Sequence, residues 1–561
     1  MNESTQGGYF SKNFYIFLGI LFIINAIQAY VTPVIYDEAY YWYYSQNLAW
    51  GYFDHPPMVA LLVKIGGLLF KGELGVRLVG CLLWNGSLML IWSLIDHKEK
   101  EKFVSLYFLL AFSMVLFNAY GFLSLPDTPV LFFTALFLWL YKRFLKQESV
   151  GIALAMGLCM AALLYSKYNA VLIILFMLLS NLKLIVNKYA WLSVLVALVA
   201  YSPHLIWLYN HDFVAVKFHL FERPNHAYKF SEFTLGYVAN LLINFGLLFP
   251  WFYWALFKTR STDKFTRSLL FIIYGIILFF LLSSFQRRIQ AQWVVAMCVP
   301  MLVISFDFIL NHVAQKKWIW RVGIISTILI IYVRVWLVYR PLIPFLKYET
   351  HDAKKWVRNL HDNVEDTPVV FENSYRKASM YSFYSGIPAF SLNNINYRQS
   401  QYSIDNSESE FQNKRIAYIA DWAKSGDFSY LIGDNKSNYG QYVDHFKSFR
   451  KLRCDTGDTP VDLRNKNQVL KLYNPYQESI VVDSLKVYVA YFNIHKKMIE
   501  THFVAQIYAE RNPNILAPES TTLFFIDYPD YKIEKPKYLK FSISDNQFSS
   551  GINSTYIKVK P

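Results

Sequence analysis

Two adjacent carboxylates, Asp37 and Glu38, belong to the most suggestive chemical motif of the chain. They lie in the segment YDEAYYW at residues 36–42, directly after an apolar run long enough to cross a bilayer. Acidic side chains at such a place are costly and are usually functional. Neighbours at i and i+1 point to different sides of a helix, so the two carboxylates should have different roles. One of them could face a cavity as a general base; the alternative is that both complement the dipole of a helix N-terminus.

Two further polar elements accompany other apolar runs. The segment GYFDHPP at residues 51–57 places Asp54 and His55 before a rigid proline pair. A histidine there could bind phosphate, hold a metal or move a proton, although an ordinary loop histidine is the simpler interpretation. Asp127 stands in the segment LPDTP at the start of another apolar run. Helix capping alone would explain Asp127, and a place in an active site is the alternative.

Three basic residues, Lys167, Arg287 and Arg288, also stand at the ends of apolar runs. Ammonium and guanidinium groups suit phosphate oxygens, and the forked guanidinium suits them best. The alternatives are lipid headgroups or pairing with carboxylates on the same face. The sequence alone leaves these interpretations evenly balanced.

The apolar runs themselves must position these side chains. Hydrophobic residues make up 54% of the 561 residues and charged residues 17%, against about 25% charged in an average soluble protein. This composition excludes a disordered chain, a coiled coil and a purely soluble enzyme. The mean hydropathy of +0.22 is nevertheless too low for a chain that is membrane throughout. We therefore expect a membrane part followed by a water-soluble part.

The membrane part is predicted to be an α-helical polytopic domain over residues 1–345, with about eleven transmembrane helices. The predicted spans lie near 14–35, 75–95, 102–121, 125–145, 150–165, 169–187, 190–209, 232–257, 268–284, 292–310 and 319–345. Between the first two, residues 37–50 and 58–70 are predicted to form helices at the membrane interface.

Loop charges predict the orientation of this domain. If the N-terminus is cytoplasmic, the inward loops carry about twice as many lysines and arginines as the outward loops. The same loops account for the net charge of +15, so no nucleic-acid partner is needed to explain it. An odd number of spans then puts everything after residue 345 on the outer face. We expect a multi-pass protein of a bacterial inner membrane with a periplasmic C-terminal region.

The C-terminal region is predicted to contain two parts. Residues 346–475 read as a small soluble α/β domain, with short buried strands at 369–371 and 430–432. Residues 476–561 show period-2 patches and read as a β-rich appendix. The four cysteines are too scattered to form a disulfide framework.

Together these residues suit sugar transfer from a lipid-linked phosphate donor. Cations would hold the phosphate leaving group, and a carboxylate would take the proton of the acceptor. A divalent ion such as Mg²⁺ or Mn²⁺, shared by Asp37, Glu38 and Asp127, is possible but not required. The chain has no Walker loop, no H-E-x-x-H and no G-x-S-x-G motif, which disfavours ATP-driven transport, metalloproteases and lipases.

Two other classes of protein remain open at this stage. A lipid or sugar transporter, or flippase, would place its ionisable residues near the bilayer midplane and would show internal repeats, neither of which is visible here. A non-catalytic assembly scaffold would use its soluble part to bind a partner. Sugar transfer by the purified protein would separate these classes.

The motifs resemble those of a known family. The pattern DEAYYW…GYFDHPPM, followed by LPDTP, LLYSKYNAVL, SPHLIWLYN and RRIQAQW, is similar to the C-type (GT-C) membrane glycosyltransferases. It is most similar to the bacterial protein O-mannosyltransferase and aminoarabinose-transferase group, which uses polyprenyl-phosphate sugars. The resemblance covers about residues 30–300 and continues weakly over 355–475. It implies a GT-C fold, a polyprenyl-phosphate sugar donor, and a lipid, glycan or protein acceptor, as in lipopolysaccharide or protein glycosylation of the cell envelope.

The resemblance also implies roles for individual residues. Asp37 matches the acidic residue held to be catalytic in the family, with Glu38 and Asp127 as supporting acids. The residues implied to bind the donor phosphate are Lys167, Arg287, Arg288 and His55. His55 stands where aminoarabinose transferases have a lysine, and only one of the two arginines is expected to match the late basic position of the family.

Overall fold

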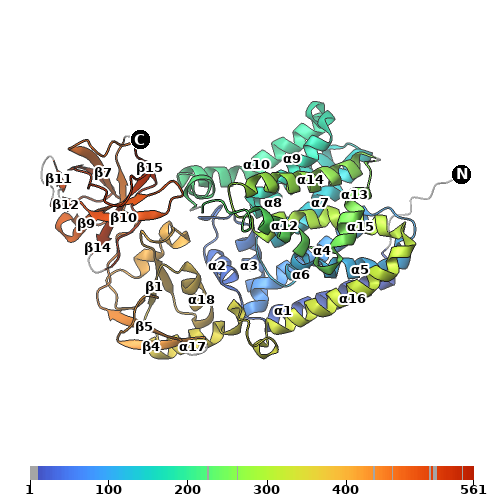
Figure 1. Cartoon of the computed structure of the whole chain (residues 1–561), viewed down its shortest axis with the longest axis horizontal. Helices are drawn as coiled ribbons and strands as arrows, with labels where there is room; N and C mark the ends of the chain where they lie inside the picture. The colour runs from blue at the N-terminus through green and yellow to red at the C-terminus, as the bar shows by residue number, and fades with distance from the viewer. Residues whose placement is uncertain are drawn as a thin grey trace. The chain divides into compact units, whose positions relative to one another are not determined.

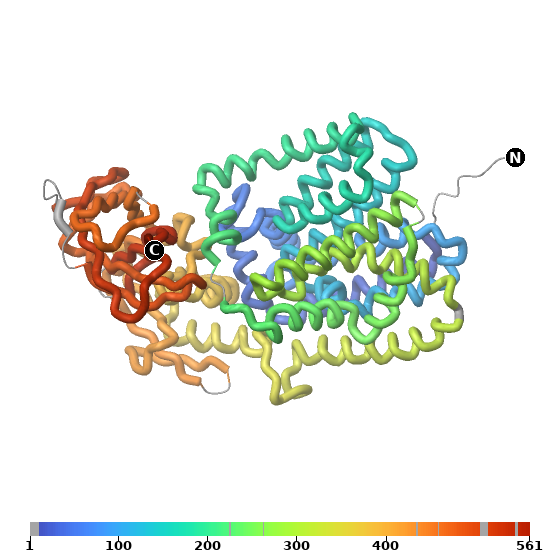
Figure 2. The backbone as a smooth tube through the Cα atoms, turned by 45° about the horizontal axis from the view of Figure 1, so that its top comes forward, coloured from blue at the N-terminus to red at the C-terminus, as the bar shows by residue number. Residues whose placement is uncertain are grey.

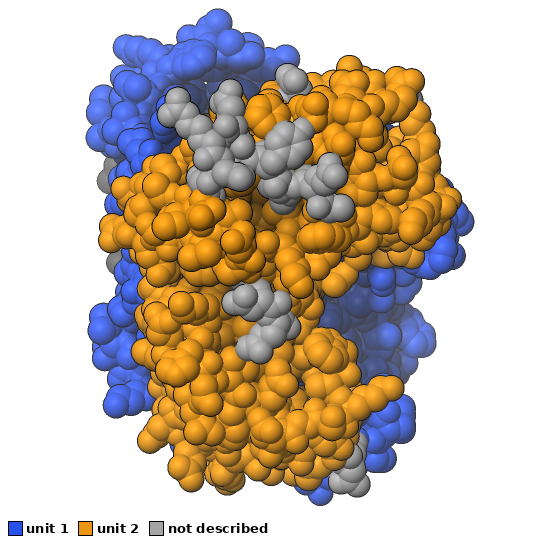
Figure 3. All heavy atoms as spheres, turned by 90° about the vertical axis from the view of Figure 1, so that its left-hand side faces the viewer, with its two compact units in different colours: residues 1–212, 228–351 blue, residues 213–227, 352–561 orange. Residues whose placement is uncertain are grey.

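The computed structural model describes residues 10–223, 226–261, 263–433, 436–457, 459–504, 507–509, 514–545 and 548–560. The chain divides into two compact units, which Figure 3 distinguishes by colour. Unit 1 comprises residues 1–212 and 228–351, and unit 2 comprises residues 213–227 and 352–561. The predicted boundary at residue 345 is close to the second of these divisions, but the short segment 213–227 belongs with unit 2.

Unit 1 is a bundle of helices that run along one another in both directions (Figures 1 and 2). Its helices are α1 (Lys12–Val31), α2 (Tyr36–Gln46), α3 (Met58–Leu69), α4 (Gly72–Leu94), α5 (Val104–Ser113), α6 (Val115–Ala119), α7 (Asp127–Lys146), α8 (Val150–Ser166), α9 (Val171–Ser180), α10 (Lys188–Asn210), α12 (Thr234–Ile243), α13 (Phe249–Lys258), α14 (Lys264–Ser284), α15 (Cys298–Leu310) and α16 (Val313–Trp336).

Unit 1 makes the chain a multi-pass membrane protein. Among the described residues, seven helices are long and apolar enough to cross a membrane, or up to eight if the bent pair at 234–258 counts as one span. The described residues therefore contain fewer helices of full spanning length than the predicted number of about eleven. The predicted spans at 102–121, 150–165 and 169–187 correspond to shorter or interrupted helices. The first is interrupted between α5 and α6, where the Val115 amide donates to the Asn244 carbonyl at 3.0 Å.

The two predicted helices after the first span are present as α2 and α3. Glu38 lies in the first turn of α2 and accepts a hydrogen bond from the Ile35 amide at 3.1 Å, as the third residue of a capping box does. Helix α3 then packs tightly on α4. A Cβ atom at Gly66 would lie 2.1 Å from the Gly75 carbonyl oxygen, so this close approach requires glycine.

Helices α1 and α16 lie side by side, although they come from opposite ends of unit 1 (Figure 1). The side chain of Gln28 donates to the Arg334 carbonyl at 3.1 Å. Between these and the other helices, buried aromatic and aliphatic side chains form one continuous core, which includes Trp84, Trp92 and Phe306. This core holds the helix ends that carry the candidate site.

Unit 2 contains an α/β layer and a β-sandwich. Its elements are α11 (Val214–Lys217), α17 (Ala353–Val364), β1 (Val369–Glu372), α18 (Tyr375–Ser385), β2 (Ala389–Leu392), β3 (Ile416–Ile419), β4 (Phe428–Ile432), β5 (Lys436–Val443), β6 (Arg453–Asp455), β7 (Gln468–Asn474), β8 (Ile480–Val481), β9 (Leu485–Phe492), β10 (Met498–Phe503), β11 (Ile507–Ala509), β12 (Ile515–Leu516), β13 (Ser520–Ile526), β14 (Tyr538–Asp545) and β15 (Ile557–Lys558).

The α/β layer is a five-stranded sheet in the order β2-β1-β3-β5-β4. Strand β1 pairs in parallel with both β2 and β3, whereas β5 is antiparallel to β3 and β4. The predicted strands at 369–371 and 430–432 lie within β1 and β4.

The β-sandwich begins earlier than predicted. Strands β6 and β7 belong to the sheet β11-β13-β7-β6, and the second sheet has the order β10-β9-β14-β15. Alternate residues of β7, β9, β13 and β14 form a shared core, for example Val487, Val489 and Tyr491. The division predicted at 475/476 therefore differs from the strand pairing, which assigns residues 453–474 to the sandwich. Local sequence could not show this, because β7 pairs with β13, about fifty residues later.

Candidate active site

Glu38 forms a buried ion pair with Arg77 of α4. Arg77 Nε lies 2.8 Å from Glu38 Oε1, Arg77 Nη2 lies 2.5 Å from Oε2, and neither side chain is exposed. The Ile35 and Ser124 amides donate to the same carboxylate at 3.1 and 2.9 Å. Each carboxylate oxygen thus accepts two hydrogen bonds, which fills the acceptor capacity of the group. Glu38 therefore ties helices together and is not available to a substrate or metal.

Arg77 extends this tie to the end of α1. Its guanidinium donates to the carbonyl oxygens of Ala29, at 2.9 Å, Thr32, and Pro33, at 3.0 Å. Arg77 is not among the site residues predicted from the sequence. A signal was present, since an arginine inside an apolar run must find a partner, and Glu38 is a carboxylate at the edge of the preceding run.

Asp37 is half-buried, while its neighbour Glu38 is completely buried. The negative charge of Asp37 acts on the phenol of Tyr120, which follows α6 and is only 3% exposed. The charge of Asp127 acts on the same phenol, and more strongly than that of Asp37. The phenol thus lies within the influence of two carboxylates from different helices. Asp37 and Glu38 thus lie in different environments, because adjacent residues of a helix point to different sides.

Asp127 and Lys167 form a second ion pair. Lys167 Nζ lies 2.7 and 2.9 Å from the two carboxylate oxygens of Asp127, and the side chains are only 13% and 6% exposed for Lys167 and Asp127. Asp127 begins α7, and Lys167 directly follows α8. Both oxygens of the Asp127 carboxylate therefore accept from the lysine. Asp127, the predicted supporting acid, and Lys167, the predicted phosphate ligand, are thus in direct contact.

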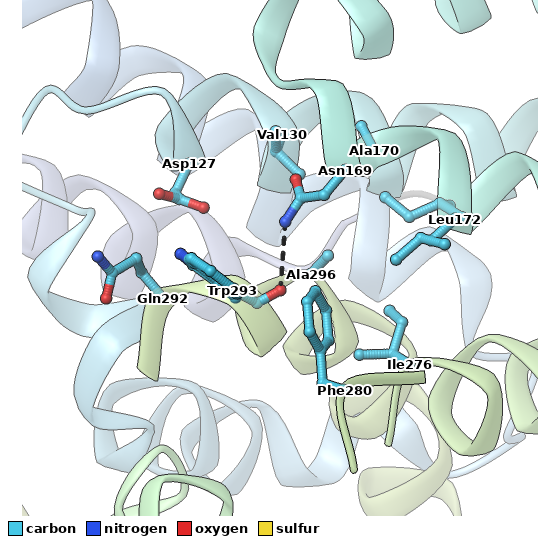
Figure 4. A pocket seen from close by; sticks show the side chains of 11 residues that line it. Asp127, Val130, Asn169, Ala170, Leu172, Ile276, Phe280, Gln292, Trp293 and Ala296 are labelled. Carbon is cyan, nitrogen blue, oxygen red and sulfur yellow. Dashed lines mark hydrogen bonds between the residues drawn. The ribbon is translucent and has the colours of Figure 1, made fainter. Parts of the chain in front are cut away.

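A small pocket lies beside this pair. Figure 4 shows Asp127 on its rim, with Gln292 and Trp293 facing it and Asn169 opposite. The amide of Asn169 donates to the Trp293 carbonyl at 3.5 Å. The other lining residues are apolar and come from α7, the 3₁₀ turn at Tyr168–Ala170, α9, α14 and the 3₁₀ turn at Ala291–Met297: Val130, Ala170, Leu172, Ile173, Ile276, Phe280 and Ala296. The pocket thus joins one polar rim to an apolar interior.

The loop that carries Asp54 and His55 is fastened to α2. The Tyr44 hydroxyl donates to Asp54 Oδ1 at 2.7 Å, and the Tyr41 and His55 rings lie 5.4 Å apart between centroids. Tyr52 stacks on Tyr44 with a centroid separation of 4.1 Å. Burial raises the pKa of Tyr52 to about 12, so its hydroxyl stays protonated and donates to the Tyr44 carbonyl at 3.0 Å.

The same loop also rests on α10. The buried His204 bonds through Nδ1 to the Trp50 carbonyl at 2.6 Å, and its Nε2 is 3.2 Å from the Tyr168 hydroxyl. A Cβ atom at Gly51 would lie 2.3 Å from the Trp207 ring, so only glycine fits here. The motif SPHLIWLYN therefore contributes a histidine that positions the loop, a role the sequence did not reveal.

Arg287 and Arg288 lie after the end of α14. Arg287 is half-buried and Arg288 is exposed. Side chains of α12 and its C-terminal cap hold their segment. The side-chain amide of Asn240 donates to the Ile289 carbonyl at 3.0 Å, and that of Asn244 donates to the Ala291 carbonyl at 3.2 Å. This backbone continues directly into Gln292 and Trp293 of the pocket wall. The two arginines are thus linked to the pocket through the chain.

The three carboxylates considered for a metal do not form a ligand set. Over the residues that the structure describes, no three His, Cys, Asp or Glu side chains gather as a potential metal site. Glu38 and Asp127 are each engaged with a basic partner, as described above. The combination of Asp37, Glu38 and Asp127, which the sequence analysis left open as a site for Mg²⁺ or Mn²⁺, therefore does not fit the geometry of the described residues.

Comparison with known proteins places these features in context. Residues 54–207 match the family of dolichyl-phosphate-mannose-protein mannosyltransferases. The lipid A galacturonosyltransferase RgtD of Rhizobium johnstonii is 27% identical over 299 residues, which cover 49% of this chain. The chain spans 60% of the length of RgtD.

Two solved structures share the architecture. ArnT from Cupriavidus metallidurans in the apo state superimposes with a TM-score of 0.54 and 12% identity, covering 73% of this chain and 92% of ArnT. The same protein bound to undecaprenyl phosphate gives a TM-score of 0.52 and 13% identity, covering 73% and 93%. These similarities are too low in identity to transfer residue roles, but they agree with the predicted architecture. The chain therefore has the fold of the C-type (GT-C) membrane glycosyltransferases, the group that its sequence motifs resemble.

Proposed function

We propose that this protein is a membrane glycosyltransferase. It moves a sugar from a polyprenyl-phosphate donor to a hydroxyl group of a lipid, glycan or protein acceptor on the outer face of a bacterial inner membrane. The observation that carries the proposal is the Lys167–Asp127 ion pair, whose carboxylate lines a small pocket, while the charges of Asp127 and the half-buried Asp37 both act on the buried phenol of Tyr120. The matched relatives are named for transfer of mannose or galacturonate.

In the proposed reaction, Asp37 accepts the proton of the acceptor hydroxyl. The hydroxyl oxygen bonds to the anomeric carbon as the bond from that carbon to the phosphate oxygen breaks, with inversion. The electron pair of the broken bond stays on the polyprenyl phosphate. One carboxylate base and nearby cations suffice, because a phosphate needs little protonation to leave.

Lys167 is the cation proposed to contact the departing phosphate. Its ammonium has three donors, and Asp127 accepts from it through both carboxylate oxygens. Asp127, which lines the pocket, thereby fixes the position of the ammonium. His55 and one of Arg287 and Arg288 are proposed to add to the positive charge around the phosphate. Tyr120, on which the charges of Asp127 and Asp37 both act, is proposed to keep Asp37 and the ion pair in register.

RgtD suggests which acceptor to test first. That protein is named for lipid A, so a lipid A-type glycolipid is proposed as the first acceptor. The informative experiment is mass spectrometry of envelope glycolipids, glycans and glycoproteins from cells with and without the gene, followed by transfer with the purified protein. The Asp37→Asn variant should not restore the missing product, whereas Asp96→Asn, a change at an exposed carboxylate, should restore it. Restoration by Asp37→Asn at the wild-type level would overturn the assignment of the base, and identical products in both strains would overturn the proposed function.

The orientation is part of the same proposal. With the N-terminus in the cytoplasm, residues 346–561 lie in the periplasm, as the loop charges suggest. A reporter that is active only outside the cytoplasm, fused after Lys347, should be active. Activity of a cytoplasmic reporter at that position would contradict the orientation.

A further inference from the structure

The parallel part of the sheet in unit 2 has a topological switch point. From β1 the chain passes through α18 to β2 on one side, and it then returns to β3 on the other side of β1. In open α/β sheets, ligands bind outside the carboxyl ends of the strands at such a point, because the two connections leave the sheet in opposite directions. The residues after β1, β2 and β3 therefore form a candidate ligand-binding edge of the sheet.

Polar side chains from all three strand ends meet at this edge. Glu372, the last residue of β1, accepts hydrogen bonds from Asn394 Nδ2 at 2.5 Å, from Trp422 Nε1 at 3.0 Å and from the Tyr418 hydroxyl. Asn373 adopts a φ of 55° and exchanges two hydrogen bonds of 2.9 Å with Asn394. The network fixes the three loops relative to one another and orients the Trp422 indole.

Trp422 is 69% exposed even though its indole N–H is held in place. The other tryptophan of unit 2, Trp356, is 2% exposed and packs in the core. Beside Trp422, Asp421 binds Lys377 Nζ at 2.5 Å and accepts from Asn438 Nδ2 at 3.5 Å. The edge thus presents a fixed aromatic surface bordered by a carboxylate, an ammonium group and an amide.

We propose that this edge, formed by Glu372, Lys377, Asp421, Trp422 and Asn438, is a saccharide-binding site that holds the glycan part of the acceptor. A sugar ring has an apolar C–H face, which an exposed indole can cover, and a rim of hydroxyl groups. Those hydroxyls both donate and accept, so they suit a border of carboxylate, amide and ammonium groups. Saccharide binding stands by itself, whereas the acceptor role rests on the proposed transferase function.

Two other ligand classes fit the edge less well. Nucleotide sites in such sheets use a glycine-rich turn after the first strand, but the turn between β1 and α18 consists of Asn373 and Ser374. The carboxylate of Asp421 is 58% exposed and would repel phosphate. It would likewise repel an anionic bilayer surface, which disfavours Trp422 as a membrane anchor.

The test uses the full-length protein in lipid nanodiscs and three soluble probes: dephosphorylated, deacylated lipopolysaccharide core oligosaccharide, chitotriose and maltotriose. Saturation-transfer NMR should detect binding of at least one probe. Trp422→Ala, which removes an exposed side chain, should weaken that binding by about tenfold or more, as truncation of an aromatic anchor typically does. Asp421→Asn should weaken it to a smaller extent. Trp318→Ala, a change at a 55% exposed indole in unit 1, should leave it unchanged.

The outcomes distinguish the new site from the membrane site. Asp37→Asn should keep the binding of the probe, so a Trp422-dependent signal supports the site even if no transfer is found. Binding of none of the probes, or binding that Trp422→Ala leaves unchanged, would overturn the proposal. The fluorescence of Trp422 can be identified as the part of the signal that is lost in Trp422→Phe. If brominated lipids quench this part, the indole lies in the bilayer and the proposal is overturned. If transfer is found, Trp422→Ala should raise KM for the acceptor with little change in kcat; an unchanged KM would exclude the acceptor role.

Discussion

Removing one member of the Glu38–Arg77 pair should strongly destabilise unit 1. In Arg77→Met the side chain keeps much of its length but loses its charge and its donors. Glu38 would then remain completely buried, with only the Ile35 and Ser124 amides as partners. Breaking a buried ion pair in this way typically costs about 3–5 kcal/mol. The variant should unfold at a clearly lower temperature than the wild type.

The reverse change should cost less. In Glu38→Gln the guanidinium of Arg77 retains three carbonyl acceptors at the end of α1. The loss is then mainly that of charge-assisted hydrogen bonds, about 1.5–3 kcal/mol. The double variant leaves no unpaired charge, so its destabilisation should be smaller than the sum of the two single losses by about 0.5–3 kcal/mol.

Thermal unfolding of the four proteins in nanodiscs, followed by tryptophan fluorescence, measures this coupling. The matched control is the pair Lys142 and Asp96, whose charged atoms lie 2.6 Å apart but whose carboxylate side chain is 74% exposed. Its coupling should be only about 0.2–1 kcal/mol. Additive losses at Glu38 and Arg77, or an Arg77→Met protein as stable as the wild type, would refute the argument that this pair fastens the helix ends.

Further changes test the site and unit 2. Asp37→Asn should lower turnover about 100-fold or more, while donor binding and stability stay near normal. The control Asp96→Asn should leave turnover, donor binding and stability near normal. Lys167→Gln should lower turnover by about 10²–10³-fold in the transfer assay, because a preorganised donor to developing charge is lost; normal turnover would move the phosphate elsewhere. Gly51→Ala should lower the unfolding temperature, since its methyl group would meet an indole ring at 2.3 Å. Burial lowers the pKa of Lys540 from 10.5 to about 8, so the unfolded chain binds more protons between these values. Stability should therefore rise with pH from about 8 to 10.5, and Lys540→Met should flatten the rise in pH-dependent melting curves.

The sequence predicted features that depend on local pattern. Apolar runs gave the long helices, alternating and continuous apolar segments gave strands such as β1 and β4, and the position of Asp37 after α1 marked the candidate site. These features arise from periodicity and from the cost of placing charge near a membrane. The count of spans could not be obtained in the same way. Interruptions such as that between α5 and α6 depend on a hydrogen bond to Asn244, about 130 residues later in the chain.

The partners of the candidate residues could not be predicted from local pattern either. Glu38 meets Arg77 at a separation of 39 residues, and Asp127 meets Lys167 at a separation of 40. Both contacts are set by how α2, α4, α7 and α8 pack. Glu38 therefore looked like a neighbour with a supporting chemical role, whereas the structure makes it a structural carboxylate. Because Glu38 is structural, Glu38→Gln would lower stability and is not a suitable control for Asp37→Asn.

The ion pairs Glu38–Arg77 and Asp127–Lys167 differ in how far their charged groups are accessible to a ligand, and their proposed roles differ accordingly. Glu38 is enclosed by four donors and has no exposed surface, so its charge is fully compensated inside the protein. Lys167 and Asp127 are compensated as well, but both side chains keep some exposure, and Asp127 lines a pocket. In the proposed reaction, an incoming phosphate can therefore share the ammonium of Lys167 with Asp127 without opening a completely buried contact. Such sharing fixes the cation before the donor arrives, and this preorganisation is what makes a charged group effective when negative charge develops on a leaving phosphate.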